Sequence, residues 1–543
     1  MADNKGVIRI ESILGGHSPT THFAGRDQFR ASLGIDPSQP IWDTTNASAI
    51  VSSGLLRPVG IAKLTDSILT NAPLWMESNP KDGNVYVLDS AGSAYTINTN
   101  FDTFTALSDG GSLSGGSGNG CAYYDNYIYF AKDTTVARYG PLSGTAAFDG
   151  DYWVTTLSKT RLTDNSNYPV DSRTSIQYPS HVLHRHSDGK LYIADVVDGK
   201  GTIHYIATTK SSVEGDTDNS STYNKVQVGY GLIPTCMESY GSDLAIAFYE
   251  GSNTFLTQNR AKIAFWDTTS TNVNKLTWVE FPDPYVSAMK NIDGVLYVAS
   301  GRIGSDGFRV SRFVGGYTFE EVDFYGTGAM PFPDAMDGQS NQLLFGSFTD
   351  VPVTSGCVYS RGLNNASLGM GRFIIHGASY SSAVSNVTSL HLSDNWNLGF
   401  LAPTVGWSTG ASGGTVNGID KRASNGYGLI NQMWWSQIYR IGQPFKITKI
   451  RIPLAGLLVS DNTSVVPKIY VDSGDSSSKV RTLTTINNTN FGGNTQSVTI
   501  RPQNLVGDND FWLELKWTGS LLLTVALPIT IEYELLDVDT SYP

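Results

Sequence analysis

The chain repeats one hydrophobic pattern, in which a turn pair precedes a short strand whose side chains alternate between two faces. It reads "DGNVYVLD" at 82–89, "DNYIYFAK" at 125–132, "DGKLYIAD" at 188–195 and "DGVLYVAS" at 293–300. Looser forms continue the series, and the first apolar residue of each form serves as a marker: Val85, Ile128, Leu191, Leu244, Leu296, Leu343 and Leu398. The markers recur about every 50 residues, which is typical of a β-propeller built from four-stranded blades.

One repeat contains enough strands for a blade. Its apolar segments "APLWMESN", "NVYVLDS", "SAYTINT" and "FTALSD" are separated by "PKDG", "AG" and "NFD". Gly and Asn adopt the positive φ of tight turns, and the Asp-Gly pairs at 82, 188 and 293, each before the same strand, indicate a β-hairpin. The markers favour seven blades, with six as the alternative count. An elongated array of β-sandwiches also repeats, but it does not require such even spacing.

The propeller is predicted to span residues 53–428 and to close with a strand from its own beginning. The segment "SGLLRPVGIAKLT" at 53–65 contains a strand that precedes the first full repeat. We expect this strand to complete the last blade near residues 386–425, because pairing it there removes an open sheet edge.

The rhythm changes at about residue 430, where "QMWWSQIYRIGQPFKITKIRIPL" opens a series of longer alternating strands. Such a series of strands over residues 429–543 favours a separate β-sandwich of jelly-roll type. The fold class predicted for the whole chain is therefore all-β: a propeller, then a jelly-roll-like sandwich, with a short N-terminal arm.

The arm, residues 1–52, follows neither strand pattern. Because its few apolar residues lack a local core, they are predicted to dock into a neighbouring chain. Packing across the propeller is the alternative. The docking residues are Ile8, Ile10, Ile13, Leu14, Phe23, Phe29 and Leu33.

Charge and composition exclude several kinds of partner. The formal net charge of −12 opposes general electrostatic binding of nucleic acid or of an anionic membrane. The longest strongly apolar stretch, "LLLTVAL" at 521–527, is too short to span a bilayer, so we expect no membrane insertion. The three cysteines form no CxxC pair, which argues against a zinc site or a disulfide framework.

The order of segments resembles uncharacterised structural proteins of tailed bacteriophages. The resemblance rests on an arm like "GVIRIESILGGHSPTTHFAGRDQF", on "SSGLLRPVGIAKL", on the propeller, and on a tail like "IYRIGQPFKITKIRIPL" with "FWLELKWTG" and "LPITIEYEL". It implies a virion component that is assembled in the host bacterial cytoplasm, is present in multiple copies, and has other virion proteins as partners.

No catalytic constellation is evident. Alternation brings His184 and His186 to one strand face, but His181 breaks the parity and no acidic or Cys partner is near in sequence. We therefore expect blade-edge histidines, with no metal and no cofactor. A propeller glycosidase requires two carboxyl groups beside the sugar, and sequence alone cannot pair carboxyls from different blades.

Aromatic residues are the remaining candidates for ligand binding. In "DFWLELKW", alternation places Trp517 on the apolar face and Trp512 with Glu514 and Lys516 on the other. Trp512, together with Trp434 and Trp435, is therefore a candidate platform for a host surface glycan, with packing between domains or subunits as the alternative.

These observations predict a bacteriophage virion protein, associated with the tail or tail fibre, that acts in assembly or host attachment without catalysis. The alternative is a polysaccharide-active propeller enzyme, a glycoside hydrolase or lyase that degrades host surface glycan.

Overall fold

The structure of this chain is a computed structural model. The described residues are 5–10, 43–45, 47–48, 55–58, 61–63, 69–100, 102–107, 117–132, 135–154, 182–197, 200–206, 224–250, 260–302, 307–316, 318–325, 330–339, 342–347, 357–362, 371–374, 385–395, 400–409, 417–422, 432–436, 439–454, 463–472, 479–493, 495–519, 525–526 and 528–536. They fall in two compact units: the propeller unit, Lys63–Val358 with Ile375–Lys421, and the C-terminal unit, Met1–Ala62 with Tyr359–Ile374 and Arg422–Pro543.

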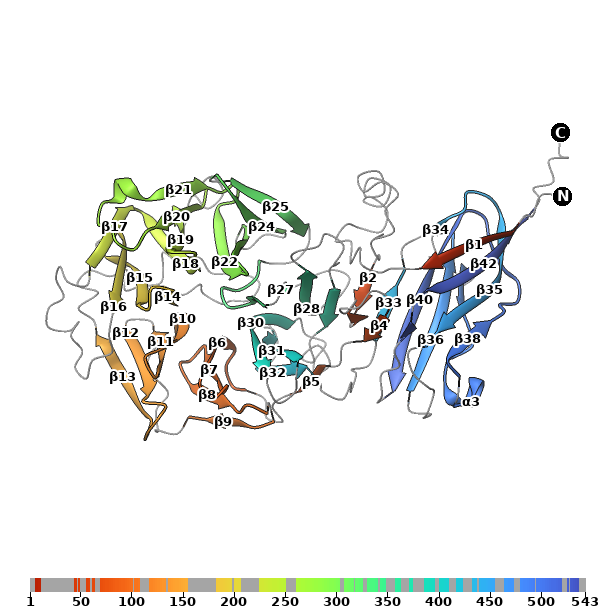
Figure 1. Ribbon diagram of the computed structural model, residues 1–543, viewed down its shortest axis with the longest axis horizontal. Coiled ribbons are helices and arrows are strands. Elements are labelled where there is room, and N and C mark those ends of the chain that lie inside the picture. Colours follow the sequence, from red (N-terminus) through yellow and green to blue (C-terminus); the bar gives the residue numbers. More distant parts are fainter. Residues whose placement is uncertain are drawn as a thin grey trace. The chain divides into compact units, whose positions relative to one another are not determined.

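The propeller unit is a ring of antiparallel blades, numbered here in chain order (Figure 1). Blade 1 consists of β6 (Pro73–Ser78), β7 (Val85–Asp89), β8 (Ala94–Ile97) and β9 (Phe104–Ala106). Blade 2 consists of β10 (Ser117–Tyr124), β11 (Tyr127–Lys132), β12 (Thr135–Gly140) and β13 (Ala147–Val154). Blade 3 consists of β14 (Val182–Arg185), β15 (Leu191–Val197), β16 (Lys200–Ile206) and β17 (Asn224–Tyr230).

The later blades follow the same order. Blade 4 consists of β18 (Leu232–Tyr240), β19 (Asp243–Glu250), β20 (Lys262–Trp266) and β21 (Thr277–Glu280), with the 3-10 turn η3 (Val273–Lys275) before its last strand. Blade 5 consists of β22 (Tyr285–Ile292), β23 (Val295–Gly301), β24 (Phe308–Gly315) and β25 (Thr318–Tyr325). Blade 6 contains β26 (Met336–Gln339), β27 (Gln342–Ser347) and β28 (Cys357–Gly362). Blade 7 contains β30 (Ser385–Asn395), β31 (Phe400–Thr409) and β32 (Asn417–Arg422).

The first strands of neighbouring blades contact one another all the way round the ring, from β6 through β10, β14, β18, β22, β26 and β30 back to β6. This arrangement confirms the propeller and the count of seven blades among the described residues. Each marker from Val85 to Leu343 lies in, or begins, the second strand of its blade. Leu398 lies outside the described residues, just before β31.

The repeated turn pairs form the predicted hairpins, but they do so with two different turn geometries. Asp293 and Gly294 both have positive φ, 50° and 86°, and join β22 to β23 directly, as a two-residue turn of type I′ does. At Asp188 the connection is longer, and the carboxylate accepts a hydrogen bond from the Lys190 backbone N–H at 3.1 Å. The same phrase thus encodes a tight turn in one blade and an Asx turn in another.

The ring closes as predicted. The fourth strand of the blade 7 sheet is β5 (Ile61–Lys63), which precedes blade 1 in sequence. Leu69 donates its backbone N–H to the carbonyl of Asn417 at 2.9 Å, and the Asn417 side-chain amide donates to the carbonyl of Thr70 at 3.1 Å. Chain segments from the two ends of the propeller are therefore joined by backbone and side-chain hydrogen bonds.

The apolar cores of the propeller lie between blades. In blade 3, Leu191 and Ile193 pack with blade 2, while Tyr192 and Ala194 pack with blade 4. Because both faces of a second strand are buried, its residues are almost continuously apolar, and the same division recurs between blades 4 and 5 and between blades 1 and 2.

The C-terminal unit contains two sheets and a small third sheet. One sheet has the order β1 (Lys5–Ile10), β42 (Ile529–Leu535), β35 (Phe445–Pro453) and β38 (Ser497–Ile500), with β39 (Leu505–Gly507) also on β35. The second includes β29 (Gly371–Ile374), β2 (Asp43–Thr45), β33 (Gln432–Trp435), β40 (Asp510–Gly519), β36 (Thr463–Val471) and β37 (Val480–Thr482), with β34 (Tyr439–Arg440) also on β40. The third has β3 (Ala47–Ser48), β4 (Leu55–Pro58) and β41 (Val525–Ala526), and one short helix, α3, spans Asn488–Phe491.

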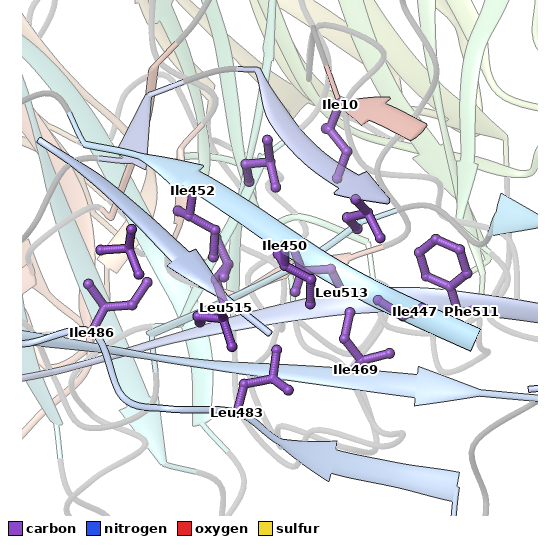
Figure 2. Close-up of a cluster of buried hydrophobic side chains, with 14 of the residues drawn as sticks. Ile10, Ile447, Ile450, Ile452, Ile469, Leu483, Ile486, Phe511, Leu513 and Leu515 are labelled. Atoms are coloured by element: carbon purple, nitrogen blue, oxygen red, sulfur yellow. The ribbon is translucent and has the colours of Figure 1, made fainter. Parts of the chain in front are cut away.

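Facing side chains of the two larger sheets form one apolar core (Figure 2). Alternate residues of β35, Ile450 and Ile452, meet Leu513 and Leu515 of β40 there. Ile447, Ile450 and Ile452 are all fully buried in this core. The jelly-roll connectivity stays a prediction.

The beginning of the arm belongs to this core, which corrects one expectation. Strand β1 pairs antiparallel with β42, and Ile10 is 4 % exposed inside the core, with Ile8 packed against it. Ile8 and Ile10 therefore do have a core within their own chain, supplied by strands more than 400 residues later. The other docking residues, Ile13, Leu14, Phe23, Phe29 and Leu33, lie outside the described residues.

Candidate functional site

A cavity of about 360 Å³ lies among the first strands of the propeller blades. Strands β6, β10, β14, β18 and β22 contribute to its walls, together with the start of β26. Its polar lining carries both signs of charge: Glu77, Glu238 and Asp334 are acidic, and Arg185 and Lys290 are basic. This volume falls at the lower end of the range for small-molecule pockets.

Strand register explains why charged residues meet here. In five blades, the first-strand residue opposite the position after the marker is polar. The pairs are Glu77 with Tyr86, His184 with Tyr192, Glu238 with Ala245, Lys290 with Tyr297, and Asp337 with Leu344. In blade 2 the same position holds Ala122, opposite Tyr129. We call these five polar residues, together with Arg185 and Asp334, the axial cluster.

Lys290 and Asp337 form the closest ion pair of the axial cluster. The Lys290 Nζ lies 2.8 Å from Asp337 Oδ1, and the Asp337 side chain is only 8 % exposed. The backbone N–H of Leu392 donates to Asp337 Oδ2 at 2.6 Å, and His391 Nδ1 lies 3.8 Å from the same oxygen. Asp337 therefore joins the first strands of blades 5, 6 and 7.

Two further carboxylates bond to backbone groups. Asp334 Oδ2 accepts a hydrogen bond from the backbone N–H of Met76 at 2.8 Å, which joins the residues before β26 to blade 1. Glu238 Oε1 accepts from the backbone N–H of Ser239 at 3.0 Å. The axial cluster thus holds first strands together as well as lining the cavity.

Burial raises the pKa of two glutamates into the neutral range. Burial is the main cause for Glu77 and for Glu238, and the Asp337 charge adds to it, while Lys290 opposes it; each pKa is raised to about 7. Burial also raises the pKa of Asp334 well above its usual value, against the hydrogen bond from Met76. These three groups hold protons at a pH where ordinary carboxyl groups are ionised.

In the Lys290–Asp337 ion pair, the pKa shift of each partner favours its charged form. Burial favours neutral Asp337, but the Lys290 charge and the hydrogen bonds outweigh it, so the pKa of Asp337 is lowered. Burial likewise disfavours charged Lys290, yet the carboxylates of Asp337 and Glu238 outweigh it and raise the pKa of Lys290. Both partners remain charged through the physiological range.

The two histidines meet on one face, as alternation predicted, and bind the next blade. His184 Nε2 and His186 Nδ1 each lie 2.9 Å from the hydroxyl oxygen of Ser239, and His186 Nε2 lies 3.2 Å from the carbonyl of Ser242. Burial lowers the pKa of His184 to about 3, so this ring is neutral. The pair joins blades 3 and 4, and no group of three or more His, Cys, Asp or Glu suited to a metal occurs in the described part of the chain.

The structure removes Trp512 from the proposed aromatic platform. Trp512 is 4 % exposed, and its ring stacks on Tyr470 with centroids 5.0 Å apart and planes 4° apart. Trp512 therefore offers no exposed ring to a glycan, because packing on the outer face of the sheet covers it. Beside it, Glu514 is 1 % exposed, accepts a hydrogen bond from the Tyr470 hydroxyl at 2.5 Å and lies 2.9 Å from Lys468 Nζ.

The other tryptophans leave the platform untested. Trp434 and Trp435 lie on β33, whose backbone pairs with β40 on one side and with β2 on the other. Their side chains, and that of Trp517, lie outside the described residues. Alternation correctly separates the two faces of β40, but it does not reveal what covers the outer one.

The pairing register of the first and second strands contains a signal for the axial cluster that residue spacing alone misses. Each of its five equivalent positions lies one hairpin before a marker, opposite the residue that follows the marker. Aligning the repeats on their hairpins would have placed these charged residues at equivalent positions of different blades, which residue spacing along the chain cannot do.

Comparison with known proteins adds little to this site. No protein-family model and no curated protein matches the chain. Similar solved structures include the Neurospora crassa Pan2 WD40 domain, at 7 % identity and a TM-score of 0.38, with 68 % of this chain and 96 % of that chain covered. U3-55K matches at 9 % identity and a TM-score of 0.40, covering 67 % of this chain and 98 % of that chain.

An exo-beta-1,3-galactanase from Phanerochaete chrysosporium, solved with galactose, matches at 9 % identity and a TM-score of 0.29, covering 67 % of this chain and 100 % of that chain. Similarities at this level transfer no activity to the chain. In the described residues, no helix is long and apolar enough to cross a membrane.

Proposed function

We propose that this chain is a structural or attachment protein of a tailed-bacteriophage virion, and that it binds and holds rather than catalyses. The observation that supports a holding role is the use of the axial carboxylates. Asp337 bonds to Lys290 and to the Leu392 backbone, and Asp334 bonds to the Met76 backbone. In both residues the carboxyl group joins different blades, as a rigid scaffold requires.

The virion location rests on the resemblance of the segment order and is tested on particles. Quantitative mass spectrometry of purified, intact virions should detect the chain in several copies per particle. Treatment that separates tails from heads should leave it with the tails. Absence of the chain from purified particles would contradict this part of the proposal.

A second function, cleavage of a host surface glycan, is supported by one specific observation. Glu77 and Glu238 line the same cavity and have pKa values of about 7. Glycosidases require one carboxyl group that stays protonated near neutral pH and a second carboxylate beside the sugar. The axial cluster contains the residue types that such chemistry needs.

One experiment separates the two functions. Purified full-length protein is incubated with host capsule or lipopolysaccharide, and reducing ends are measured over long times at pH 6 to 8. The holding role predicts no release. Release that is abolished in Glu77→Gln and in Glu238→Gln, but retained in Glu321→Gln on the propeller surface, would establish the enzyme instead.

A further inference from the structure

We propose that the axial cluster is a proton-controlled latch on the propeller ring. While Glu77 and Glu238 carry protons, the first strands of blades 1, 4 and 5 are held together around the Lys290–Asp337 pair. Loss of both protons loosens these strands and widens the cavity. The proposal concerns the ring itself and does not depend on the proposed function.

The balance of charges around the cavity is the first reason. Three carboxyl groups, those of Glu77, Glu238 and Asp334, line the cavity with two cations, Lys290 and Arg185, and the carboxylate of Asp337 pairs with Lys290. The nearest cation is already engaged, because Lys290 Nζ lies 2.8 Å from Asp337. If Glu77 and Glu238 ionise, they add two negative charges, and only Arg185 is left to balance them. Like charges in a confined space repel each other.

The placement of these carboxyl groups is the second reason. Glu77 lies on β6 and Glu238 on β18, while Lys290, whose charge interacts with both, lies on β22. Repulsion among these residues acts directly between first strands of different blades. Contacts between first strands hold the centre of the ring, so the effect of ionisation is concentrated there.

Every strand around the cavity contributes titratable or charged neighbours that set the pH range of the latch. They are Cys121 on β10, His184 and Arg185 on β14, Cys236 on β18, Lys290 on β22, Asp334 and Asp337 at β26, and His391 on β30.

The buried carboxyl groups and the buried histidines change the stability of the ring on opposite sides of neutral pH. The pKa of Glu77 and of Glu238 is raised from 4.5 to about 7, so the stability that they contribute is complete below pH 4.5 and is lost as pH rises through about 7. The raised pKa of Asp334 acts in the same direction. His184 and His391 have lowered pKa values, so their contribution is present above pH 6.5 and is lost only on acidification.

Between pH 6.5 and 8.5, therefore, the contributions of His184, His391 and Asp337 to stability are constant. The change in stability comes from the carboxyl groups whose pKa is raised. We expect hydrogen exchange in β6, β18 and β22 of the wild-type protein to become about tenfold faster, beyond its intrinsic pH dependence, over this interval. In the double variant Glu77→Gln/Glu238→Gln, less than half of this change should remain, because Asp334 still titrates.

Glu321→Gln provides the control, since Glu321 is exposed and pairs with Arg309 on blade 5. This variant should show the full wild-type change. Equal acceleration in the double variant and in the wild type would contradict the latch, as would constant exchange in wild-type β6, β18 and β22 across the interval.

A measurement on the wild-type protein applies even if the double variant does not fold. Infrared titration should detect protonated carboxyl groups at pH 6 that lose their protons near pH 7, and the single variant Glu238→Gln should reduce this signal. A wild-type protein without protonated carboxyl groups at pH 6 would overturn the proposal.

Discussion

The propeller unit and the C-terminal unit bury apolar side chains in different places. In the C-terminal unit, one core lies between two sheets, where Phe445 and Phe511 contact each other with ring centroids 5.6 Å apart. In the propeller unit, separate clusters lie between neighbouring blades, and polar residues line the first strands. Glu77, Glu238 and Lys290 on first strands of the propeller thus line a cavity. In the C-terminal unit, buried Glu514 instead lies on the face of β40 that is turned away from the core.

The largest effect should come from the single core. Phe511→Ala removes a fully buried ring that contacts Phe445 and Tyr439, so we expect the free energy of unfolding to fall by about 4 kcal/mol. Urea denaturation followed by fluorescence measures this loss. Val506→Ala, at a residue that is 45 % exposed in the same unit, should change stability by less than about 0.5 kcal/mol. A similar loss in both variants would contradict the idea of one shared core.

The buried charge of the C-terminal unit gives the next effect. Lys468→Met removes the cation 2.9 Å from Glu514, whose side chain is 2 % exposed, and should cost about 3 kcal/mol. The double variant Lys468→Met/Glu514→Gln should regain most of that stability, because the remaining groups are neutral. If the double variant is less stable than Lys468→Met, Glu514 is stabilised mainly by other groups, such as the Tyr470 hydroxyl.

The equivalent pair in the propeller is expected to have a smaller effect, because Lys290 is 35 % exposed to the cavity. Asp337→Asn should reduce the free energy of unfolding by about 2 kcal/mol at pH 7, measured by urea denaturation. Since the pKa of Asp337 is lowered, its contribution is present above pH 3.8 and is lost as pH falls through the lowered value. The variant and the wild type should therefore converge in acid.

Glu320→Gln is the matched control for this pair. Glu320 lies 2.8 Å from Arg312, but its side chain is 54 % exposed, so the loss should stay below about 0.5 kcal/mol. Equal losses for Asp337→Asn and Glu320→Gln would show that the axial position adds nothing to an ordinary surface ion pair.

The smallest effect tests the repeated turns. Gly294 has a φ of 86°, which side-chain-bearing residues rarely adopt, so Gly294→Ala should cost about 1 kcal/mol. Gly144→Ala should be nearly neutral, because its new Cβ would lie 3.7 Å from Pro141, an ordinary contact distance. Thermal unfolding of both variants measures the difference, and a neutral Gly294→Ala would mean that this hairpin adapts freely.

Much of the propeller was predictable because its information is local. The Asp-Gly pair at 293–294 combines turn chemistry with a following apolar strand, and the pairs at 82–83 and 188–189 reuse this short combination. The strand that closes the ring was predictable for a related reason, since the segment containing Ile61–Lys63 had no place in the first repeat.

The rest depends on contacts that no local pattern contains. Ile10 is buried because β1 pairs with β42, and Trp512 is covered by Tyr470 of the neighbouring strand β36. The axial cluster likewise requires residues from five blades, and the raised pKa values of Glu77 and Glu238 arise only once those blades enclose them. Periodicity identifies the faces of a strand, but the identity of the neighbour on each face is a property of the folded ring.

Ring closure also determines when the propeller can finish folding on the ribosome. Leu69 bonds to Asn417, 348 residues later, so blade 7 cannot be completed until nearly the whole propeller has been synthesised. Until then, the face of blade 1 that carries Met76 and Val85 lacks Ile419, its contact from blade 7. A nascent or truncated chain that ends before β30 should therefore expose apolar surface and bind chaperones or aggregate, whereas release of the complete chain allows the ring to close.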